Sequence, residues 1–109
     1  NFIALVGSWR SAAKIGSVAA AMQRATDVPV RWAALPLWVS GVSWSDHWPF
    51  ARRGMPAFMV TDTAPYRYRW YHEPEDLPDR LDVHAMAAVV DGVEAALRQQ
   101  VEVPSSTKR

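Results

Sequence analysis

The sequence predicts an α/β fold, a layered sandwich around a mostly parallel sheet, and three observations support this prediction. Apolar segments of strand length occur at residues 2–6, 28–35 and 56–61. Segments with helical spacing of apolar residues alternate with these strands, as in layered α/β proteins. Half of the 109 residues are hydrophobic, so a chain of this size can bury one core.

The first strand and helix are predicted by a change in apolar periodicity. Residues 2–6 form a continuous apolar run closed by Gly7 and Ser8, which is typical of a strand buried on both faces. A helix is expected over residues 11–25, with Ser8 or Ser11 as its N-cap. Its apolar face repeats every three or four residues, at Ile15, Val18, Met22 and Ala25.

Prolines and glycines delimit the middle of the chain. Residues 28–35 form the second predicted strand, and residues 36–45 are turn-rich and predict a loop. A short helix is expected over residues 46–53, because Pro49 fits only in its first turn. Gly54 then suits the left-handed residue that ends such a helix.

The last third holds a strand, a long loop and the clearest helix. Residues 56–61 predict a third buried strand, and the loop at residues 62–81 is longer than usual connections, which is typical of functional loops. Asp82 is a suitable N-cap for a helix over residues 83–100. We expect one apolar stripe on this helix, formed by Met86, Val89, Val90, Val93 and Leu97.

Strand direction then predicts where ligand chemistry lies. In a parallel sheet, ligands bind at the carboxyl ends of the strands. Residues 36–47 and 62–76 follow the second and third strands. We therefore expect these two loops at the same edge of the sheet.

Composition excludes several classes of function. The formal net charge of +1 gives no electrostatic reason to bind nucleic acid, and the acids after residues 66–71 offset the arginines interleaved with aromatics there. No apolar run approaches the roughly 20 residues of a membrane span. Cysteine is absent, so a metal would be held by histidine and carboxylates. Ser45 lacks the pattern of a nucleophile elbow.

Three histidines are candidates for chemistry. His84 falls in the first turn of the last helix and reads as a solvated residue, whereas His47 reads as a hydrogen-bonded residue that holds its loop, or as a ligand. His72 lies in the long loop, where it is either a solvated histidine or a metal ligand. For a metal-bound imidazole, Asp76 or Glu75 is near enough in sequence to anchor the second ring nitrogen.

One histidine does not make a metal site. A catalytic zinc takes about three protein ligands and a water, and the sequence contains no HExxH pair. Asp46 has two readings, as N-cap of the short helix or as a carboxylate facing the same edge as His72. Because the chain opens at Asn1 with a strand already under way, we expect it to be a piece of a longer protein.

Residues 41–82, GVSWSDHWPFARRGMPAFMVTDTAPYRYRWYHEPEDLPDRLD, resemble a known family. The matching motifs, in order, are Asp-His-x-Pro-Phe at residues 46–50, Arg-Gly-x-Pro at residues 53–56, Thr-Asp-Thr at residues 61–63, and an aromatic-His loop leading to Asp76. This region is similar to the C-terminal part of the co-catalytic zinc aminopeptidases, a family that also contains glutaminyl cyclases and glutamate carboxypeptidases.

The resemblance implies a hydrolase-like zinc exopeptidase fold with a mixed sheet and two zinc ions that share a bridging carboxylate and a water. His72 looks like a zinc ligand, and Tyr71 like the tyrosine that stabilises the tetrahedral intermediate. Asp46, Asp62 and Asp76 look like carboxylates that lie behind the metal ligands or face the substrate. Where members carry threonine after the histidine and the later aspartate, this chain has Glu73 and Leu77.

The resemblance also implies an organisation. Residues 1–103 would be the C-terminal part of a zinc peptidase domain, with a disordered tail at residues 104–109. The other zinc ligands and the general base would lie upstream, so the chain alone should be inactive, bind zinc poorly and self-associate. Alternatives are a cyclase with one zinc and a non-catalytic scaffold that binds proteins. The family includes secreted, periplasmic and membrane-anchored settings, which leaves the compartment open.

Overall fold

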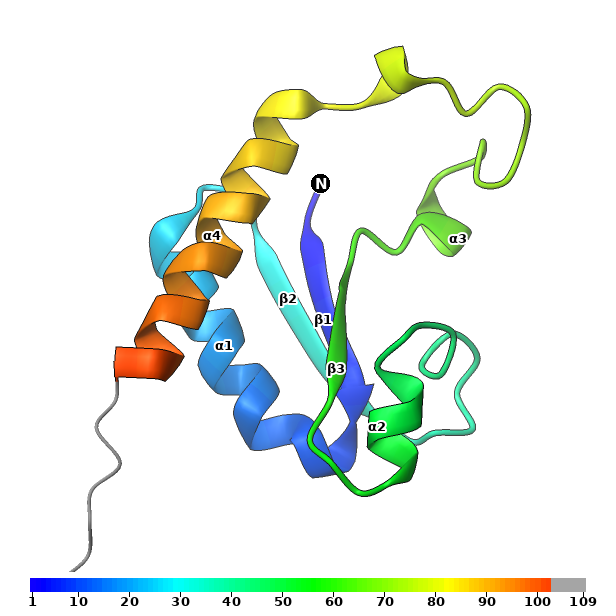
Figure 1. Ribbon diagram of the computed structural model, residues 1–109. Coiled ribbons are helices and arrows are strands. Elements are labelled where there is room, and N and C mark those ends of the chain that lie inside the picture. The colour runs from blue at the N-terminus through cyan, green and yellow to red at the C-terminus, as the bar shows by residue number, and fades with distance from the viewer. Residues whose placement is uncertain (103–109) are drawn as a thin grey trace, which may run out of the picture.

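A computed structural model describes residues 1–102 of the chain (Figure 1). The tail expected at residues 104–109 lies outside the described residues. The elements are, in order, β1 (Ile3–Ser8), η1 (Trp9–Ser11), α1 (Ala12–Ala25), β2 (Val30–Leu35), α2 (Trp48–Arg52), β3 (Phe58–Thr61), α3 (Ala64–Arg67), η2 (Pro78–Arg80) and α4 (Val83–Glu102).

The predicted α/β class is confirmed, and the sheet is mixed. Its strand order is β2-β1-β3, with β1 in the middle. β1 and β2 are parallel, with Ile3 opposite Val30. β1 and β3 are antiparallel, with Ala4 opposite Thr61. β3 was predicted to be buried, but it is a partly exposed edge strand because only β1 pairs with it among the described residues.

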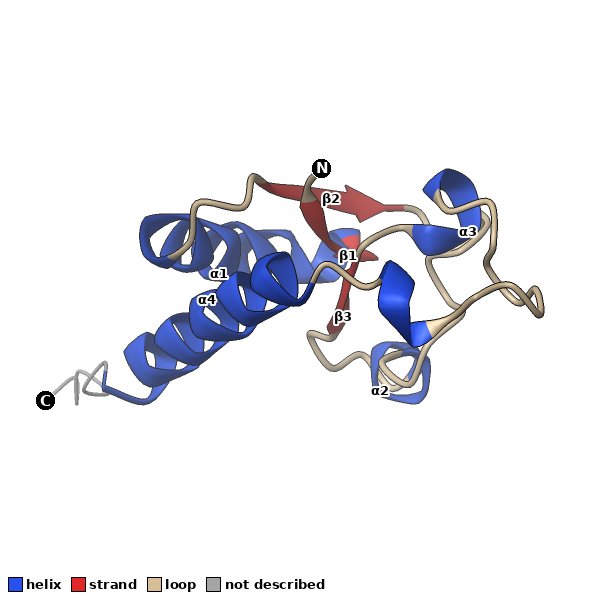
Figure 2. Ribbon diagram, turned by 90° about the horizontal axis from the view of Figure 1, so that it is seen from above, coloured by secondary structure: helices blue, strands red, loops and turns tan. Residues whose placement is uncertain are grey.

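The helices and strands form two layers around one apolar core. α1 and α4 cover one face of the sheet, and α2 and α3 lie beyond the other (Figure 2). Leu5 from β1 and Ile15 and Met22 from α1 are completely buried in the core. This agrees with the predicted apolar face of the first helix, except that its last member, Ala25, is exposed.

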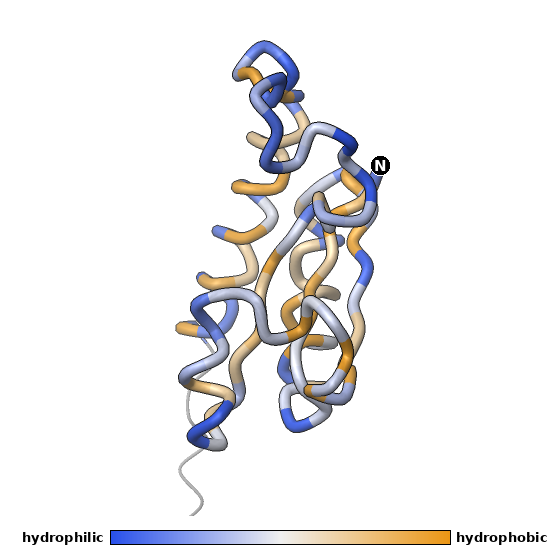
Figure 3. The backbone as a smooth tube through the Cα atoms, turned by 90° about the vertical axis from the view of Figure 1, so that its right-hand side faces the viewer, coloured by the Kyte–Doolittle hydropathy of each residue, from blue (hydrophilic) through white to orange (hydrophobic). Residues whose placement is uncertain are grey.

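The predicted single stripe of α4 is wrong, because the helix carries two apolar faces. Val89 and Val93 pack against the core, and the small residues Gly92 and Ala96 are buried there. Five other apolar residues are exposed and form an outer stripe, which consists of Val83, Met86, Val90, Leu97 and Val101. In Figure 3 the hydrophobic colour recurs along the outer side of this helix. Gly92 permits α4 to lie close to the end of α1, since a Cβ there would lie 3.2 Å from Thr26 Cγ2.

The predicted helix caps have mixed outcomes. Asp82 caps α4, since its Oδ1 accepts a hydrogen bond from the Ala85 amide at 2.9 Å. Asp46 does not cap α2, whose N-cap is His47. Ser11 precedes α1, but its hydroxyl instead donates to the Ala57 carbonyl and accepts from the Ala57 amide, at 3.0 and 3.1 Å. This buried serine therefore joins the start of α1 to the residue that directly precedes β3.

The molecule is flat and extended. Its principal dimensions are 58 × 32 × 17 Å, and its radius of gyration of 15.4 Å exceeds the roughly 13 Å of a compact chain of this length. The long loop at residues 62–81 contains the short helices α3 and η2, which the sequence did not predict. Within residues 1–102, no helix has the length and apolarity needed to cross a membrane.

Candidate functional site

The antiparallel direction of β3 changes where the two functional loops begin. Leu35 ends β2 beside Ser8, whereas Thr61 ends β3 beside Ala4, at the opposite edge of the sheet. The prediction that both loops start at one edge is therefore wrong. The prediction assumed that the third strand is parallel, and this strand instead returns along the open side of β1.

The loops nevertheless meet, because the segment after β2 folds back along the sheet. The Tyr66 hydroxyl of α3 donates to the Ser40 carbonyl at 3.0 Å. Beneath this contact, Gly41 has a φ of 92°, and a Cβ there would lie 3.2 Å from Tyr66 Oη. A glycine at this position thus permits both the turn and the close approach of the two loops.

A pocket of about 610 Å³ lies where these segments meet. Its wall includes residues from β1, β2 and β3 on the sheet face opposite α1, together with both loops. Its apolar and aromatic lining includes Val6, Leu35, Val42, Met59, Tyr66 and Tyr71. The wall is mostly apolar and open on one side, as in a pocket that accepts part of a ligand.

Tyr71 and His72 stand together at this pocket. Tyr71 lines it, and its ring stacks on the His72 ring with centroids 4.0 Å apart and planes 16° apart. Both side chains are exposed. His72 has a φ of 62°, in the left-handed region that few residues other than glycine adopt, although histidine, asparagine and aspartate are enriched there.

The three predicted carboxylates occupy different surroundings. Asp62 lines the pocket, and its Oδ1 accepts from the Ala64 amide at 2.9 Å. Asp76 accepts from the Tyr68 hydroxyl at 2.9 Å. The expected hydrogen bond between Asp76 or Glu75 and His72 is absent from residues 1–102, so the acid at position 76 holds the loop through Tyr68 instead. Asp46 is exposed and outside the pocket wall.

The loop that carries Tyr71 and His72 is packed against itself. The Arg69 and Arg80 guanidinium groups lie 4.2 and 4.6 Å from the centre of the Trp70 ring. Partial burial of Tyr68 raises the pKa of its phenol above 10.0, and the hydrogen bond to Asp76 raises this pKa further. The phenol therefore stays protonated and able to donate at neutral pH.

The other two histidines lie in the surroundings expected of non-catalytic residues. His47 Nε2 lies 2.6 Å from the Val42 carbonyl, which fixes the proton on Nε2 and holds the loop, while its Nδ1 is buried without a partner among the described residues. His84 is exposed on α4. Arg67 and Tyr68 were not predicted to matter, and only the aromatic-arginine pattern at residues 66–71 could have drawn attention to them.

The described residues alone do not fit a complete zinc centre. Residues 1–102 contain no group of three histidine, cysteine, aspartate or glutamate residues able to hold a metal ion. His72 has an exposed imidazole whose nitrogen could serve as one ligand of a larger set. Any zinc bound at this position would need further ligands.

Comparison with known proteins identifies the family. Residues 8–97 match the family model described as peptidase family M28. The chain belongs to peptidase family M28. This agrees with the resemblance found in residues 41–82. The M28 peptidases are generally zinc-dependent, and membership supports a hydrolase at the level of the family.

One relative of this M28 chain is the uncharacterized protein YfbL of Escherichia coli (strain K12). The two are 41% identical over 93 residues, which is 85% of this chain and 29% of the relative. The chain thus spans less than a third of the length of the curated relative it matches. No solved structure matches significantly.

Proposed function

We propose that this chain forms one wall of the active site of a zinc-dependent exopeptidase of the aminopeptidase type. The observation that carries this proposal is the position of Tyr71, which lines the apolar pocket and stacks on His72. Membership of a peptidase family supports the reaction class. The pocket would hold an apolar side chain at the amino terminus of a peptide. Its apolar wall favours this reading over a cyclase, which would bind the polar side chain of an N-terminal glutamine.

Each site residue has a role in this proposal. His72 contributes one nitrogen ligand to zinc, and residues outside this chain contribute the others. Zinc, when bound, supplies a Lewis acid and lowers the pKa of its water. The Tyr71 hydroxyl donates to the oxygen that becomes negative as the peptide carbonyl is attacked; one such donor can be worth about 10²–10³ in rate.

The carboxylates support the substrate and the loop in the same proposal. Asp62 lies in the pocket wall, so its negative charge attracts the ammonium group at the substrate's amino terminus. Asp76 acts indirectly, because its hydrogen bond with Tyr68 holds the loop that carries Tyr71 and His72. Asp46 is exposed and would face the substrate only in the longer protein.

The test uses the full-length protein that contains this sequence. His72→Ala should lower kcat/KM for leucyl p-nitroanilide by about 100-fold or more and reduce the zinc retained after dialysis, because a metal ligand is lost. Elemental analysis measures the zinc. His84→Ala is the matched control, since this exposed histidine lies away from the pocket wall, and it should leave both quantities unchanged.

One result would refute the role of His72 as a zinc ligand. Near-normal hydrolysis by His72→Ala with unchanged metal content would remove His72 from the site. The 109-residue chain by itself is expected to be inactive and to bind zinc weakly, because one imidazole cannot close the coordination of a zinc ion.

A further inference from the structure

Arg67 is the last residue of α3 and joins three parts of the molecule through its guanidinium group. Nη2 donates to the Phe2 carbonyl at 2.8 Å, just before β1. Nε donates to the Asp62 carbonyl at 3.0 Å, and Nη2 also bonds to that carbonyl. Nε further donates to Thr63 Oγ1. One side chain thus connects the start of β1, the end of β3 and α3.

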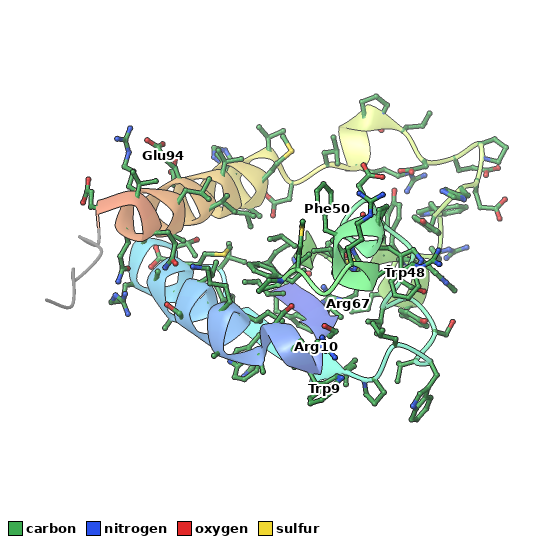
Figure 4. All side chains as sticks on the ribbon, turned by 60° about the horizontal axis from the view of Figure 1, so that its bottom comes forward. Trp9, Arg10, Trp48, Phe50, Arg67 and Glu94 are labelled. Atoms are coloured by element: carbon green, nitrogen blue, oxygen red, sulfur yellow. The ribbon has the colours of Figure 1, made fainter. Side chains whose placement is uncertain are left out.

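The same guanidinium group packs on an aromatic ring. Its central carbon lies 3.7 Å from the centre of the Phe2 ring, within the range of a cation–π interaction. A planar fork of donors that also stacks on a ring is specific to arginine, since lysine offers a single point charge. Figure 4 shows Arg67 beside the strands, whereas Glu94 lies on the side of α4 that faces away from α1.

Arg67 bonds to Asp62 and Thr63, two residues of a strained turn. Thr63 has φ 60° and ψ 33°, a left-handed conformation that is unfavourable for a β-branched residue. The turn is also held by two local bonds, from the Thr63 amide to Thr61 Oγ1 at 3.0 Å and from the Ala64 amide to Asp62 Oδ1 at 2.9 Å. These local bonds shape the turn, but only Arg67 ties it to Phe2 among the described residues.

The turn held by Arg67 is part of the pocket. Residues 59–66 contribute one continuous side of its wall, which ends at Tyr66, whose hydroxyl reaches Ser40. From α3 the chain continues to Tyr71 at the pocket edge. A change in the angle of α3 would therefore move this wall of the pocket, whereas Tyr71 lies beyond α3 in a loop that the hydrogen bond between Tyr68 and Asp76 also holds.

We propose that Arg67 is a positioning residue that sets the shape of this pocket, and hence its preference for a large apolar side chain at the substrate's amino terminus. The inference rests on the proposed function, because it assigns specificity to the same site. Arg67 is exposed and does not belong to the core cluster, so its loss should alter the pocket without unfolding the molecule.

The kinetic test compares two substrates in the full-length protein. In Arg67→Lys, KM for leucyl p-nitroanilide should rise about tenfold while kcat changes less than threefold, since the pocket wall is displaced but the reacting groups remain. Alanyl p-nitroanilide, whose methyl group does not fill the pocket, should change little. Arg98→Lys is the matched control, because its side chain pairs with Glu94 on α4 and does not line the pocket.

Three kinetic results would overturn the proposal. The first is an unchanged leucyl KM in Arg67→Lys. The second is an equal loss for the leucyl and alanyl substrates, and the third is the same loss in the Arg98→Lys control. Each would mean that the pocket's selectivity does not depend on Arg67.

Hydrogen–deuterium exchange separates this inference from the proposed function. In Arg67→Lys, the hydrogen-bonded amides of Ala64, Tyr66 and Tyr68 should exchange at least tenfold faster, while amides of β1 and α1 keep their rates. If the wild-type protein hydrolyses neither substrate but these rates rise, the proposed peptidase function fails and the positioning contact stands. If these rates stay unchanged, Arg67 does not position the turn.

Discussion

Tyr68 holds the loop that carries Tyr71 and His72 through its hydrogen bond to Asp76. Partial burial and this carboxylate raise the pKa of the Tyr68 phenol above 10.0. The folded state therefore binds the phenolic proton more tightly than the unfolded state does. The resulting stabilisation is complete below pH 10 and is lost as the pH rises through the folded pKa.

Spectrophotometric titration at 295 nm checks this prediction. Subtracting the curve of Tyr68→Phe from that of the wild type should isolate one phenol that titrates above pH 10.0. Asp76→Asn should lower that midpoint, because it removes the negative charge that opposes ionisation. A midpoint that stays the same in Asp76→Asn would show that the two side chains do not interact in solution.

Single residues were predictable from the sequence only where their contacts are local. The cap at Asp82 and the left-handed glycine at residue 54 depend on neighbours within a few positions, and both are found. The Ser11 hydroxyl bonds to residue 57, and Arg67 bonds to residue 2. Such contacts depend on how distant segments pack, which no local pattern records.

The pairing of β1 with β3 depends on a glycine in the middle strand. A Cβ at Gly7 would lie 2.7 Å from Phe58 Cβ and 2.9 Å from the Ala57 carbonyl oxygen, and these atoms cannot move without shifting β3. Gly7→Ala should therefore lower the free energy of unfolding by about 1–3 kcal/mol, the usual cost of overpacking. Urea denaturation measures this change.

Gly16→Ala is the control for that experiment. A Cβ at Gly16 would make ordinary contact with the Trp32 ring at 3.4 Å, and alanine is favoured over glycine inside a helix by about 1 kcal/mol. This variant should be as stable as the wild type or more stable. If Gly7→Ala unfolds at the wild-type urea concentration, the two strands are not as close as the structure shows.

Element types could be predicted from the sequence better than strand direction. The three strands and the two long helices were predicted within a few residues of their ends, because apolar periodicity follows from local geometry. The direction of β3 was missed, since alternation of strands and helices is typical of parallel crossovers, whereas α2 is too short to cross the sheet. α3 was not predicted, because its short segment contains Pro65 and polar neighbours.

The whole molecule exposes an apolar stripe along the outer side of α4. Val90 and Leu97 are 59% and 61% exposed in this stripe, although both are large apolar residues. We expect the 109-residue chain to associate with itself at tens of micromolar, because burying this stripe removes apolar surface from water. Sedimentation velocity should show species heavier than a monomer.

Charge placed on the stripe should reverse this association. Val90→Lys combined with Leu97→Lys should return the chain to a monomer. Ala20→Lys, on the exposed side of α1, adds a similar charge elsewhere and should not. A wild-type chain that sediments as a clean monomer would contradict the expected association.

The candidate site could be predicted only in part at this scale. Motif spacing in residues 41–82 led to the correct family, because the spacing of a site's residues along the chain is itself a sequence property. The pocket could not be predicted, since its wall joins three strands and two loops that meet only after folding. The metal ligation by His72 remains a prediction.

The middle position of β1 affects how the protein is made. Of the three described strands, β1 is synthesised before both of its sheet neighbours. At the usual 5–20 residues per second, β3 follows it by roughly 3–10 s. During that interval an apolar strand has at least one edge free to pair with another nascent chain. Early docking of α1 onto β1 would shield one face but not this edge, so expression yield should be sensitive to translation speed and to chaperones that bind extended apolar segments.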